Sequence, residues 1–362
     1  MVFPKSSHDS KVAKLQKLIY EDEVTDMNEL RKIAWAGIPP SFRHICWKLL
    51  LGYLPPAREK RAATLERHRN EYKLLIDKYY NNNRCPNDEI WRQIHIDLPR
   101  MQPLISIFQQ DIVQRIFQRI LYIYSIRHPA SGYVQGMNDL VIPFFVVYLS
   151  EFIPENSLAT FETFQVSSLS DDVLDGVEAD SFWSVKKLLD SIQDNYTFAQ
   201  PGIQNLVLLL EKIMSRIDST LHEHLVRNNV QYLLFSFRWM NNLLTRELPL
   251  RCIIRLWDTY LSEGGLSSLN TSGCSLTPAL DSKPSNSSID NGSPFASSFH
   301  LYVCSAFLRY WSKNLLKENE FQGIILFLQN LPTYHWTDNE IELLVADAYL
   351  LKQTFTPNHL SS

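Results

Sequence analysis

A glutamine stands between two glycines in the stretch SGYVQGMNDL, residues 131–140. Gly132 and Gly136 tolerate backbone conformations that other residues resist, which predicts a tight turn around Gln135. A side-chain amide donates and accepts hydrogen bonds at the same time, so Gln135 could hold a water with its oxygen and steady a phosphoryl oxygen with its nitrogen. On these residues alone, a solvated turn glutamine is the simpler interpretation.

The residues after this turn predict the start of a buried helix. The apolar run LVIPFFVVYL follows directly, and Asn138 or Asp139 could cap a helix that begins there. A helix N-terminus carries a positive potential that attracts anions such as phosphate. The turn and the helix together therefore suit the neighbourhood of a phosphate group.

A second stretch that could do chemistry is WRQIHIDLPRMQP, residues 91–103. Pro99 and Pro103 restrict the backbone around Arg100, which predicts a stiff segment that holds the guanidinium at a defined angle. Asp97 could orient this guanidinium, and an arginine presented in this way binds an oxyanion at little entropic cost. The Asp-x-x-Arg pattern is common by chance, so an ordinary surface ion pair of little energetic value is the alternative.

Taken together, the two stretches point to phosphoryl transfer. An arginine neutralises charge that develops on the transferred phosphoryl group, and a glutamine aims the attacking water; GTP hydrolysis needs these two functions besides the bound nucleotide and Mg²⁺. The chain has no GxxxxGK[ST] loop and no GxGxxG or GxSxG motif. We therefore expect both side chains to act on a nucleotide that another protein holds.

The elements that position these residues are predicted to be helices. Apolar residues recur three or four positions apart in residues 111–127, with Gln and Arg on the opposite side, as in an amphipathic helix. Pro249 suits a helix start, and Thr337 with Glu340 forms a capping pattern. Alternating strands with hairpin turns are missing, and only 11 glycines serve 362 residues, so we expect an all-α fold. Further helices are predicted at 231–248, 250–263, 321–331 and 337–353.

Two polar stretches interrupt the helical pattern. Residues 262–298 are dominated by Ser, Gly, Asn and Pro. They hold too little apolar surface to offset the entropy of ordering them, which predicts a disordered insertion. Residues 154–178 contain several acidic side chains and predict an acidic connector. Both stretches are interpreted as solvated linkers.

Composition restricts the class of protein. Lys and Arg number 35 against 39 Asp and Glu, a formal net charge of −4, which argues against a nucleic-acid-binding protein. Five scattered cysteines without a CxxC pair are typical of a reducing compartment. His222 and His224 would point to different sides of a helix, so no metal site is expected. The longest apolar run is about half as long as a membrane-spanning helix, and the first residues lack the features of a signal peptide, so we expect a soluble protein.

Several motifs resemble, in order, those of the TBC-domain family, the GTPase-activating proteins of Rab GTPases. RHICW at 43–47 is similar to the RxxxW element of the family, IHIDLPR at 94–100 to IxxDxxR, GYVQGMND at 132–139 to YxQG, and RLWDTYL at 255–261 to a later segment. The flanking residues are most similar to the fungal Golgi Rab regulators and their vertebrate relatives. Met101 stands where many members carry threonine, a departure that we expect to affect local packing.

The resemblance implies an all-helical domain in which two helical subdomains form a V-shaped groove, and a mechanism with two supplied side chains. Arg100 would enter the active site of the GTPase and stabilise the transition-state charge. Gln135 would replace the GTPase's own glutamine in aiming the water. Asp97 would orient Arg100, and Tyr133 would support the glutamine turn. The other motif residues would be Arg43, Gly136 and Asn138 as supporting or contact residues, with Arg43 either bracing a helix pair or touching the GTPase, and Trp47, Trp257 and Asp258 as architecture.

The resemblance also implies a partner, a GTP-bound Rab GTPase that would hold GTP and Mg²⁺, so that the chain would need no cofactor of its own. The protein would be cytoplasmic and would reach Golgi or early secretory membranes peripherally through that GTPase, in vesicle traffic. Residues 1–29 would form an N-terminal arm with the first helix, 30–350 the domain with its insertion, and 351–362 a tail. The alternative is a catalytically silent module of the same fold that binds a Rab GTPase or a scaffold.

Overall fold

The computed structural model describes residues 7–81, 89–153, 158–264 and 299–355. Within these ranges the regular structure is helical, and one isolated bridge pairs Val24 with Ala57. The α-helices are α1 (Ser7–Gln16), α2 (Met27–Trp35), α3 (Pro40–Leu50), α4 (Arg61–Leu75), α5 (Glu89–Asp97), α6 (Asp111–Arg127), α7 (Met137–Leu149), α8 (Leu158–Thr163), α9 (Asp171–Ser191), α10 (Pro201–Ile217), α11 (Ser219–Arg227), α12 (Leu233–Asn242), α13 (Leu250–Glu263), α14 (Phe299–Tyr310), α15 (Ser312–Leu315), α16 (Phe321–Gln329) and α17 (Asp338–Phe355). The prediction of an all-α fold is confirmed.

Short 3₁₀ and π turns connect several of these helices. The π turns are η1 (Lys17–Glu21) and η3 (Ile76–Asn81), and the 3₁₀ turns are η2 (Arg58–Lys60), η4 (Leu98–Arg100), η5 (Ser106–Gln109), η6 (Ser150–Phe152), η7 (Val166–Ser168) and η8 (Gln193–Asn195). The turn η4 matters most for function, because it continues α5 and ends at Arg100.

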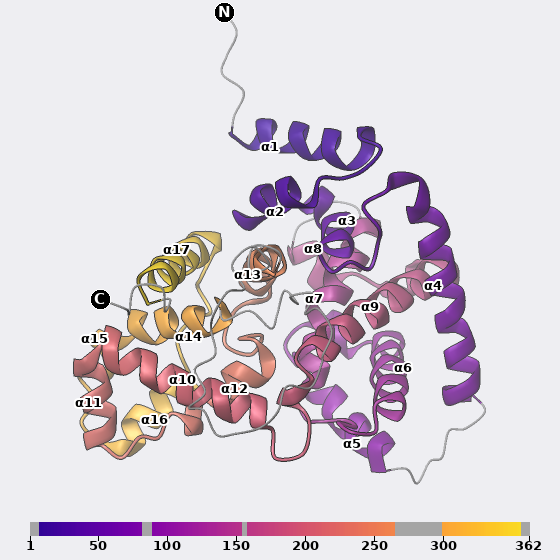
Figure 1. The fold of residues 1–362 in the computed structure, drawn as a ribbon. Helices are drawn as coiled ribbons and strands as arrows, with labels where there is room; N and C mark the ends of the chain where they lie inside the picture. Colours follow the sequence, from indigo (N-terminus) through magenta and orange to yellow (C-terminus); the bar gives the residue numbers. More distant parts are fainter. Residues whose placement is uncertain (1–6, 82–88, 154–157, 265–298, 356–362) are drawn as a thin grey trace, which may run out of the picture.

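The helices form two groups (Figure 1). The first group, α3 to α9, lies on one side of the view. The second group, α10 to α12 with α14 to α17, lies on the other. Helix α13 lies between them and packs against α2, against α3 and α7 of the first group, and against α17 of the second group. Helix α7, whose residues are all buried, packs against α9 in the first group. The apolar run after the glutamine turn is therefore a core helix, as its sequence predicts.

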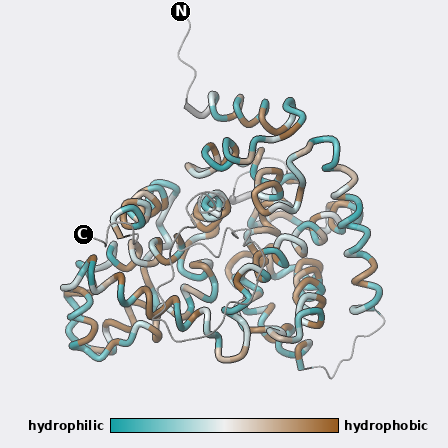
Figure 2. Tube along the Cα trace, viewed as in Figure 1, coloured by the Kyte–Doolittle hydropathy of each residue, from teal (hydrophilic) through white to brown (hydrophobic). Residues whose placement is uncertain are grey.

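One continuous hydrophobic core joins the two groups. Trp47 of α3 stacks on Trp257 of α13 with ring centroids 6.2 Å apart, and Phe144 of α7 meets both rings edge-on. Along the chain, hydrophobic and hydrophilic residues alternate within most helices (Figure 2). This alternation is what an amphipathic helix needs to bury one face and solvate the other.

The predicted helices at 111–127 and 250–263 match α6 and α13 residue for residue. Pro249 is the residue before α13, and the amide and hydroxyl of Thr337 both donate to Glu340 Oε2 at the start of α17. The helix predicted at 231–248 is too long, because α12 ends at Asn242. Leu243 and Leu244, both buried, adopt left-handed backbone conformations that stop the helix.

The prediction of an acidic connector over residues 154–178 is wrong for residues 171–178. Helix α9 begins at Asp171, and acidic residues in a first turn favour the helix dipole. Glu178 is buried and accepts hydrogen bonds from the Tyr72 hydroxyl and from Arg119 Nε, each at 2.8 Å. Sequence composition suggests a solvated carboxylate here, but partners from α4 and α6 satisfy it inside the protein.

The edges of the predicted insertion and tail also shift. Ser262 and Glu263 belong to α13 and are buried, and Glu263 binds Trp35 Nε1 at 2.7 Å and Lys352 Nζ at 2.6 Å. The remainder of the insertion, residues 265–298, lies outside the described residues. Helix α17 extends to Phe355, beyond the predicted start of the tail. The division of the chain at residue 30 stays a prediction.

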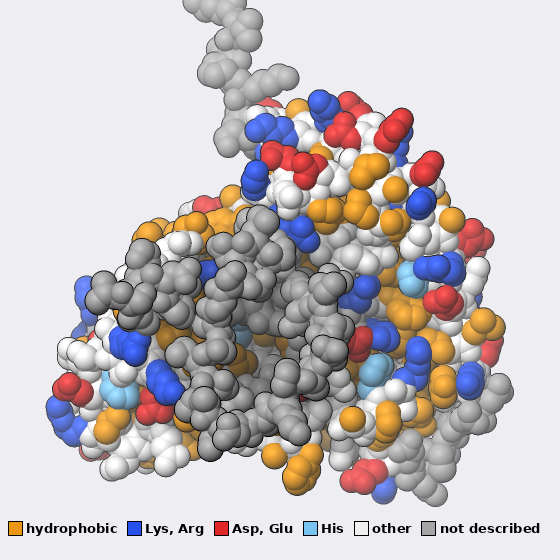
Figure 3. All heavy atoms as spheres, viewed as in Figure 1, with side chains coloured by type: hydrophobic (Ala, Val, Ile, Leu, Met, Phe, Trp, Pro, Cys, Tyr) orange, Lys and Arg blue, Asp and Glu red, His pale blue; other side chains and the backbone are white. Residues whose placement is uncertain are grey.

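On the face shown in Figure 3, Lys and Arg side chains are interspersed with Asp and Glu. Of the helices in the described ranges, none combines the length and the apolar character that a membrane span requires. Cys46, Cys252 and Cys304 are buried free thiols.

Candidate functional site

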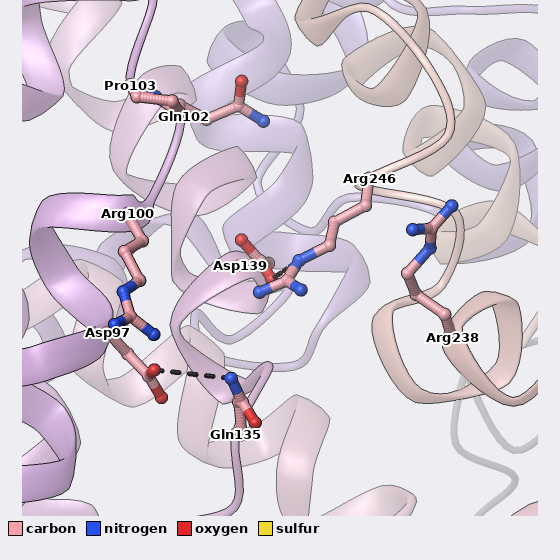
Figure 4. A pocket seen from close by; sticks show the side chains of 8 residues that line it. All are labelled: Asp97, Arg100, Gln102, Pro103, Gln135, Asp139, Arg238 and Arg246. Atoms are coloured by element: carbon pink, nitrogen blue, oxygen red, sulfur yellow. Dashed lines mark hydrogen bonds and ion pairs between the residues drawn. The ribbon is translucent and has the colours of Figure 1, made fainter. Parts of the chain in front are cut away.

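A cavity of ≈ 340 Å³ lies where the two groups of helices meet. Its lining residues are Asp97, Arg100, Gln102, Pro103, Gln135 and Asp139 from the first group and Arg238 and Arg246 from the second. Figure 4 shows the two arginines of the second group entering from the side opposite Arg100. The structure thus brings together the arginine and the glutamine that the sequence singles out in separate stretches.

Arg100 is exposed at the end of η4 because its neighbours anchor the turn. Leu98 and Met101 are buried at 3% and 2% exposure, whereas Pro99 between them faces solvent. The Met101 carbonyl accepts a hydrogen bond from Gln109 Nε2 at 3.0 Å. A short turn that is anchored on both sides and stiffened by proline holds the Arg100 backbone in place. The methionine at this position packs into the core, in line with the expected local effect.

The expected pairing of Asp97 with Arg100 is absent from the contacts of the described chain. Instead, Asp97 Oδ2 accepts from the Tyr133 hydroxyl at 2.9 Å, and Asp97 Oδ1 accepts from Gln135 Nε2 at 3.5 Å (Figure 4). Both carboxylate oxygens are thus engaged by the glutamine turn. Within the described residues Asp97 thus contacts Tyr133 and Gln135 and makes no hydrogen bond or ion pair with Arg100, the residue that it is expected to orient.

Tyr133, which the resemblance expects to support the glutamine turn, donates its hydroxyl hydrogen bond to Asp97. Its side chain is 8% exposed, and burial together with the nearby Asp97 carboxylate raises the pKa of its hydroxyl well above the ordinary value. A phenol that stays protonated is a permanent hydrogen-bond donor. Through this donor Tyr133 ties the turn to the end of α5, the helix that leads to Arg100.

The turn contains two glycines with positive φ. Gly132 has φ 59° and Gly136 has φ 104°, both in the region that L side chains rarely adopt. The Met137 amide donates to the Val134 carbonyl at 3.1 Å and closes the turn around the exposed Gln135. Gly136 rather than a polar side chain is the N-cap of α7. The prediction that Asn138 or Asp139 caps this helix is therefore wrong.

Asn138 and Asp139 are buried in the first turn of α7, with 1% and 3% exposure. Asn138 Oδ1 lies 3.5 Å from the Tyr133 hydroxyl, so this residue can support the turn but cannot touch a partner protein. Asp139 Oδ2 accepts from Asn242 Nδ2 at 2.6 Å and from Arg246 Nε at 2.5 Å. Burial raises the pKa of Asp139, and Arg246 and Asn242 oppose that rise.

Arg238 and Arg246 are cavity residues that the sequence does not single out. They fall inside the helix predicted at 231–248, where their charge suggests a solvent-exposed helix face. Arg238 binds Glu247 with Nε at 2.5 Å and Nη2 at 2.9 Å. Arg246 lies beyond the true end of α12, in the segment that turns back toward α7. The helix end has no glycine or proline to announce it, so sequence patterns place Arg246 on a helix surface instead of in the turn that follows.

The RxxxW and WD residues brace the domain. Asp258 is completely buried and accepts from Arg43 Nε at 3.1 Å, from Trp47 Nε1 at 2.7 Å and from the Ile38 amide at 2.9 Å. Trp257 beside it stacks on Trp47. These bonds join α13 to α3 and to the residues before it. The tryptophans and Asp258 are thus buried at the contact between α3 and α13, where Arg43 also binds Asp258; their architectural role stays a prediction that these contacts support.

The charged side chains that line the cavity suit an anionic ligand. Asp139 pairs with Arg246 and the Glu247 carboxylate pairs with Arg238. Arg100, in contrast, makes no ion pair within the described part of the chain. An exposed arginine on an anchored turn, with an amide beside it, can meet an oxyanion and a water together. No cluster of metal-ligating side chains occurs among the described residues.

Comparison with known proteins gives the family. The model of the Rab-GTPase-TBC domain matches residues 40–277. TBC1 domain family member 22B of Homo sapiens is 52% identical over 353 residues, which cover 97% of this chain and 63% of that protein. GTPase-activating protein GYP1 of Saccharomyces cerevisiae is 38% identical over 377 residues, covering 95% of this chain and 59% of that protein. The chain thus spans about three fifths of the length of these relatives.

Solved structures show the same fold. The crystal structure of the Ypt/Rab-GAP domain of Gyp1p superposes with a TM-score of 0.84 at 39% identity, covering 97% of this chain and all of that one. A Chlamydomonas flagellar RabGAP TBC domain, at 16% identity and a TM-score of 0.61, shares the fold. The ordered motifs, the helical architecture and the matched domain agree, and this chain belongs to the family of Rab-GTPase-TBC domains.

Proposed function

We propose that this domain accelerates GTP hydrolysis by a Rab-family GTPase by offering Arg100 and Gln135 to the nucleotide that the GTPase holds. The observation that carries the proposal is that both side chains are exposed on the wall of one cavity although they come from separate segments. The relative in Saccharomyces cerevisiae that bears the name GTPase-activating protein supports the same activity. The GTPase would supply GTP and Mg²⁺.

We infer different tasks for the two side chains. A water attacks the γ-phosphorus, the bond from phosphorus to the bridging oxygen of GDP breaks, and GDP and phosphate leave. The Arg100 guanidinium stabilises the charge on the transferred group and the leaving oxygen. Gln135 Nε2 faces Asp97, which leaves Oε1 of the same amide free to accept a hydrogen bond from the attacking water. Asp97, which also accepts from the Tyr133 hydroxyl, orients that amide.

Single-turnover GTP hydrolysis across a panel of purified Rab GTPases tests the proposal. A supplied arginine is worth roughly 10³ to 10⁵ in rate, or about 4 to 7 kcal/mol of barrier. Arg100→Ala should lose most of the acceleration while helical content and thermal stability stay near those of the unmodified domain. Arg100→Lys should fail almost as badly, because a point charge cannot form the planar fork. Gln135→Ala should also cripple hydrolysis.

Matched controls come from helix α5 itself. Arg92 and Gln93 are exposed and do not line the cavity, so Arg92→Ala and Gln93→Ala should keep full acceleration. A Rab GTPase whose own glutamine is replaced should still respond to the unmodified domain. Unfolding of Arg100→Ala would show a structural role for the arginine. Binding of GTP-loaded GTPase without any acceleration would establish the silent module in place of the activator.

We also propose that the protein acts at Golgi or early secretory membranes in vesicle traffic, which it would reach from the cytoplasm through the bound GTPase. This placement rests on the similarity to the fungal regulators and their vertebrate relatives. Imaging of the tagged protein in cells tests it: loss of the membrane signal after depletion of the responsive GTPase is expected. A membrane signal that is independent of every responsive GTPase would refute recruitment by that route.

A further inference from the structure

A series of hydrogen bonds connects the side of the cavity opposite Arg100 to the glutamine turn. It begins at Arg246, whose Nε binds Asp139 Oδ2 at 2.5 Å (Figure 4). The same carboxylate oxygen accepts from Asn242 Nδ2 at 2.6 Å. Asn242 Oδ1 accepts from Asn241 Nδ2 at 2.8 Å, and this Nδ2 also donates to the carbonyl oxygen of Gln135 at 3.2 Å. The chain therefore ends on the backbone of the residue that would aim the water.

The asparagine pair is held firmly at the end of α12. The Tyr196 hydroxyl donates to the Asn241 carbonyl at 2.7 Å, and Thr245 Oγ1 donates to the Asn242 carbonyl at 2.7 Å. Leu243 and Leu244, buried in left-handed conformations, fix the direction in which the chain leaves the helix. Non-glycine residues persist in such conformations only where the surrounding structure determines them. The second group of helices thus presents a rigid support to the turn.

The turn lies in close contact with this support. A Cβ on Gly136 would lie 2.6 Å from Asn241 Nδ2 and 2.8 Å from Asn242 Oδ1, so only glycine allows the approach. Arg246 is the cation that pairs with the buried Asp139 carboxylate at the other end of the chain. Without that cation, a carboxylate buried at 3% exposure would favour its protonated form or a different arrangement of its donors. Either change reaches Asn242 first and then the turn.

We propose that Arg246 is a positioning residue for Gln135: it acts through Asp139 and the Asn241–Asn242 pair to fix the glutamine turn, and does not act on the nucleotide. The inference rests on the proposed function, because it assigns Gln135 a catalytic task. It means that the backbone of the glutamine turn is held from the second group of helices through Asn241, whereas Asp97 of the first group contacts the side-chain amide of Gln135. The activity of the two supplied side chains then depends on the packing between the groups.

A double-mutant cycle in single-turnover hydrolysis, at saturating concentration of the domain, separates positioning from direct contact. Arg246→Ala and Asn241→Ala should each lower the maximal rate by roughly 10- to 100-fold, since a misplacement of about 1 Å can cost 10²-fold. In the Gln135→Ala background the same changes should have no further effect. Arg246→Lys should recover part of the rate, because a single bond from Nε can be replaced by an ammonium group.

Arg251→Ala is the matched control, since Arg251 pairs with Asp338 outside the cavity through bonds of 2.9 and 2.8 Å. It should leave the maximal rate unchanged. A loss from Arg246→Ala that persists undiminished in the Gln135→Ala background would overturn the proposal and place Arg246 on the nucleotide or the GTPase. If Arg246→Ala does not fold, Arg246→Lys and Asn241→Ala decide by the same cycle.

Amide hydrogen exchange of residues 131–140 gives a readout that does not need a GTPase. Arg246→Ala should speed exchange in this stretch relative to Arg251→Ala, while the rest of α7 stays protected. Faster exchange with no acceleration by the unmodified domain would reject the proposed function and leave the positioning contact intact. Unchanged exchange would reject the positioning role even in a domain that is fully active.

Discussion

Gly136→Ala tests whether the asparagine pair is a fixed support for the glutamine turn. Gly132→Ala is its matched control, because both glycines have positive φ, at 104° and 59°, but only Gly136 is crowded. A methyl group at Gly132 meets nothing within 4 Å, so the change should cost only the left-handed backbone strain, about 1 to 2 kcal/mol. It should keep most of the activity.

At Gly136 the methyl group would displace both asparagines. Displacement endangers the bond of Asn241 to the Gln135 carbonyl at 3.2 Å and that of Asn242 to the Asp139 carboxylate at 2.6 Å. A neutral hydrogen bond contributes about 1 kcal/mol and one to a charged group about 1.5 to 3 kcal/mol. We therefore expect Gly136→Ala to lose about 2 to 4 kcal/mol more than Gly132→Ala.

Urea denaturation of the two variants measures this difference, and single-turnover hydrolysis measures the effect on the turn. Gly136→Ala should lose at least about tenfold in maximal rate, because Gln135 moves with the turn. Equal stability and equal activity of the two alanine variants would refute the reasoning. That result would mean that the asparagines yield freely and do not define the position of the glutamine.

Two further predictions concern stability. Asp258→Ala removes the shared acceptor of Arg43 and Trp47, so urea denaturation should show a free energy of unfolding lower by about 3 to 5 kcal/mol. Loss of the exposed Asp338 should lower it by less than about 1 kcal/mol. Equal losses would contradict the bracing role. Burial lowers the pKa of His300 to about 4. As the pH falls from about 6.5 to 4, this imidazole is protonated in the unfolded chain but stays neutral in the folded domain. The free energy of unfolding should therefore drop by about 3 kcal/mol over that window. The pH dependence should be shallower in His300→Gln, and identical slopes in the two proteins would argue against a neutral buried imidazole.

The amphipathic helices could be predicted because their pattern is local. Apolar spacing alone gives α6 and α13 with their ends, and Pro249 and Thr337 mark two helix starts. The glycines around Gln135 likewise announce a turn, because positive φ is a property of the residue itself. The Ser-rich composition of the insertion can also be read directly, although residues 265–298 lie outside the described chain.

Tertiary partners decided what the local pattern got wrong. Glu178 belongs to a helix and is buried because Tyr72 and Arg119 satisfy its carboxylate, and no neighbour in sequence signals this. Helix α12 stops at Asn242 because burying Leu243 and Leu244 forces a left-handed backbone. Asp97 contacts the glutamine turn and not the arginine, because the fold places the Tyr133 hydroxyl 2.9 Å and the Gln135 amide 3.5 Å from its two oxygens.

The sequence by itself determined the helical class of this protein and the two side chains that could act on a phosphate, since both follow from residue types and short spacings. The tertiary structure alone decided that Arg100 and Gln135 share a cavity and that Arg246 completes its far wall. Hydrogen bonds and ion pairs between distant segments depend on which helices pack together. That packing is a property of the whole core, and it cannot be read from any one stretch of the chain.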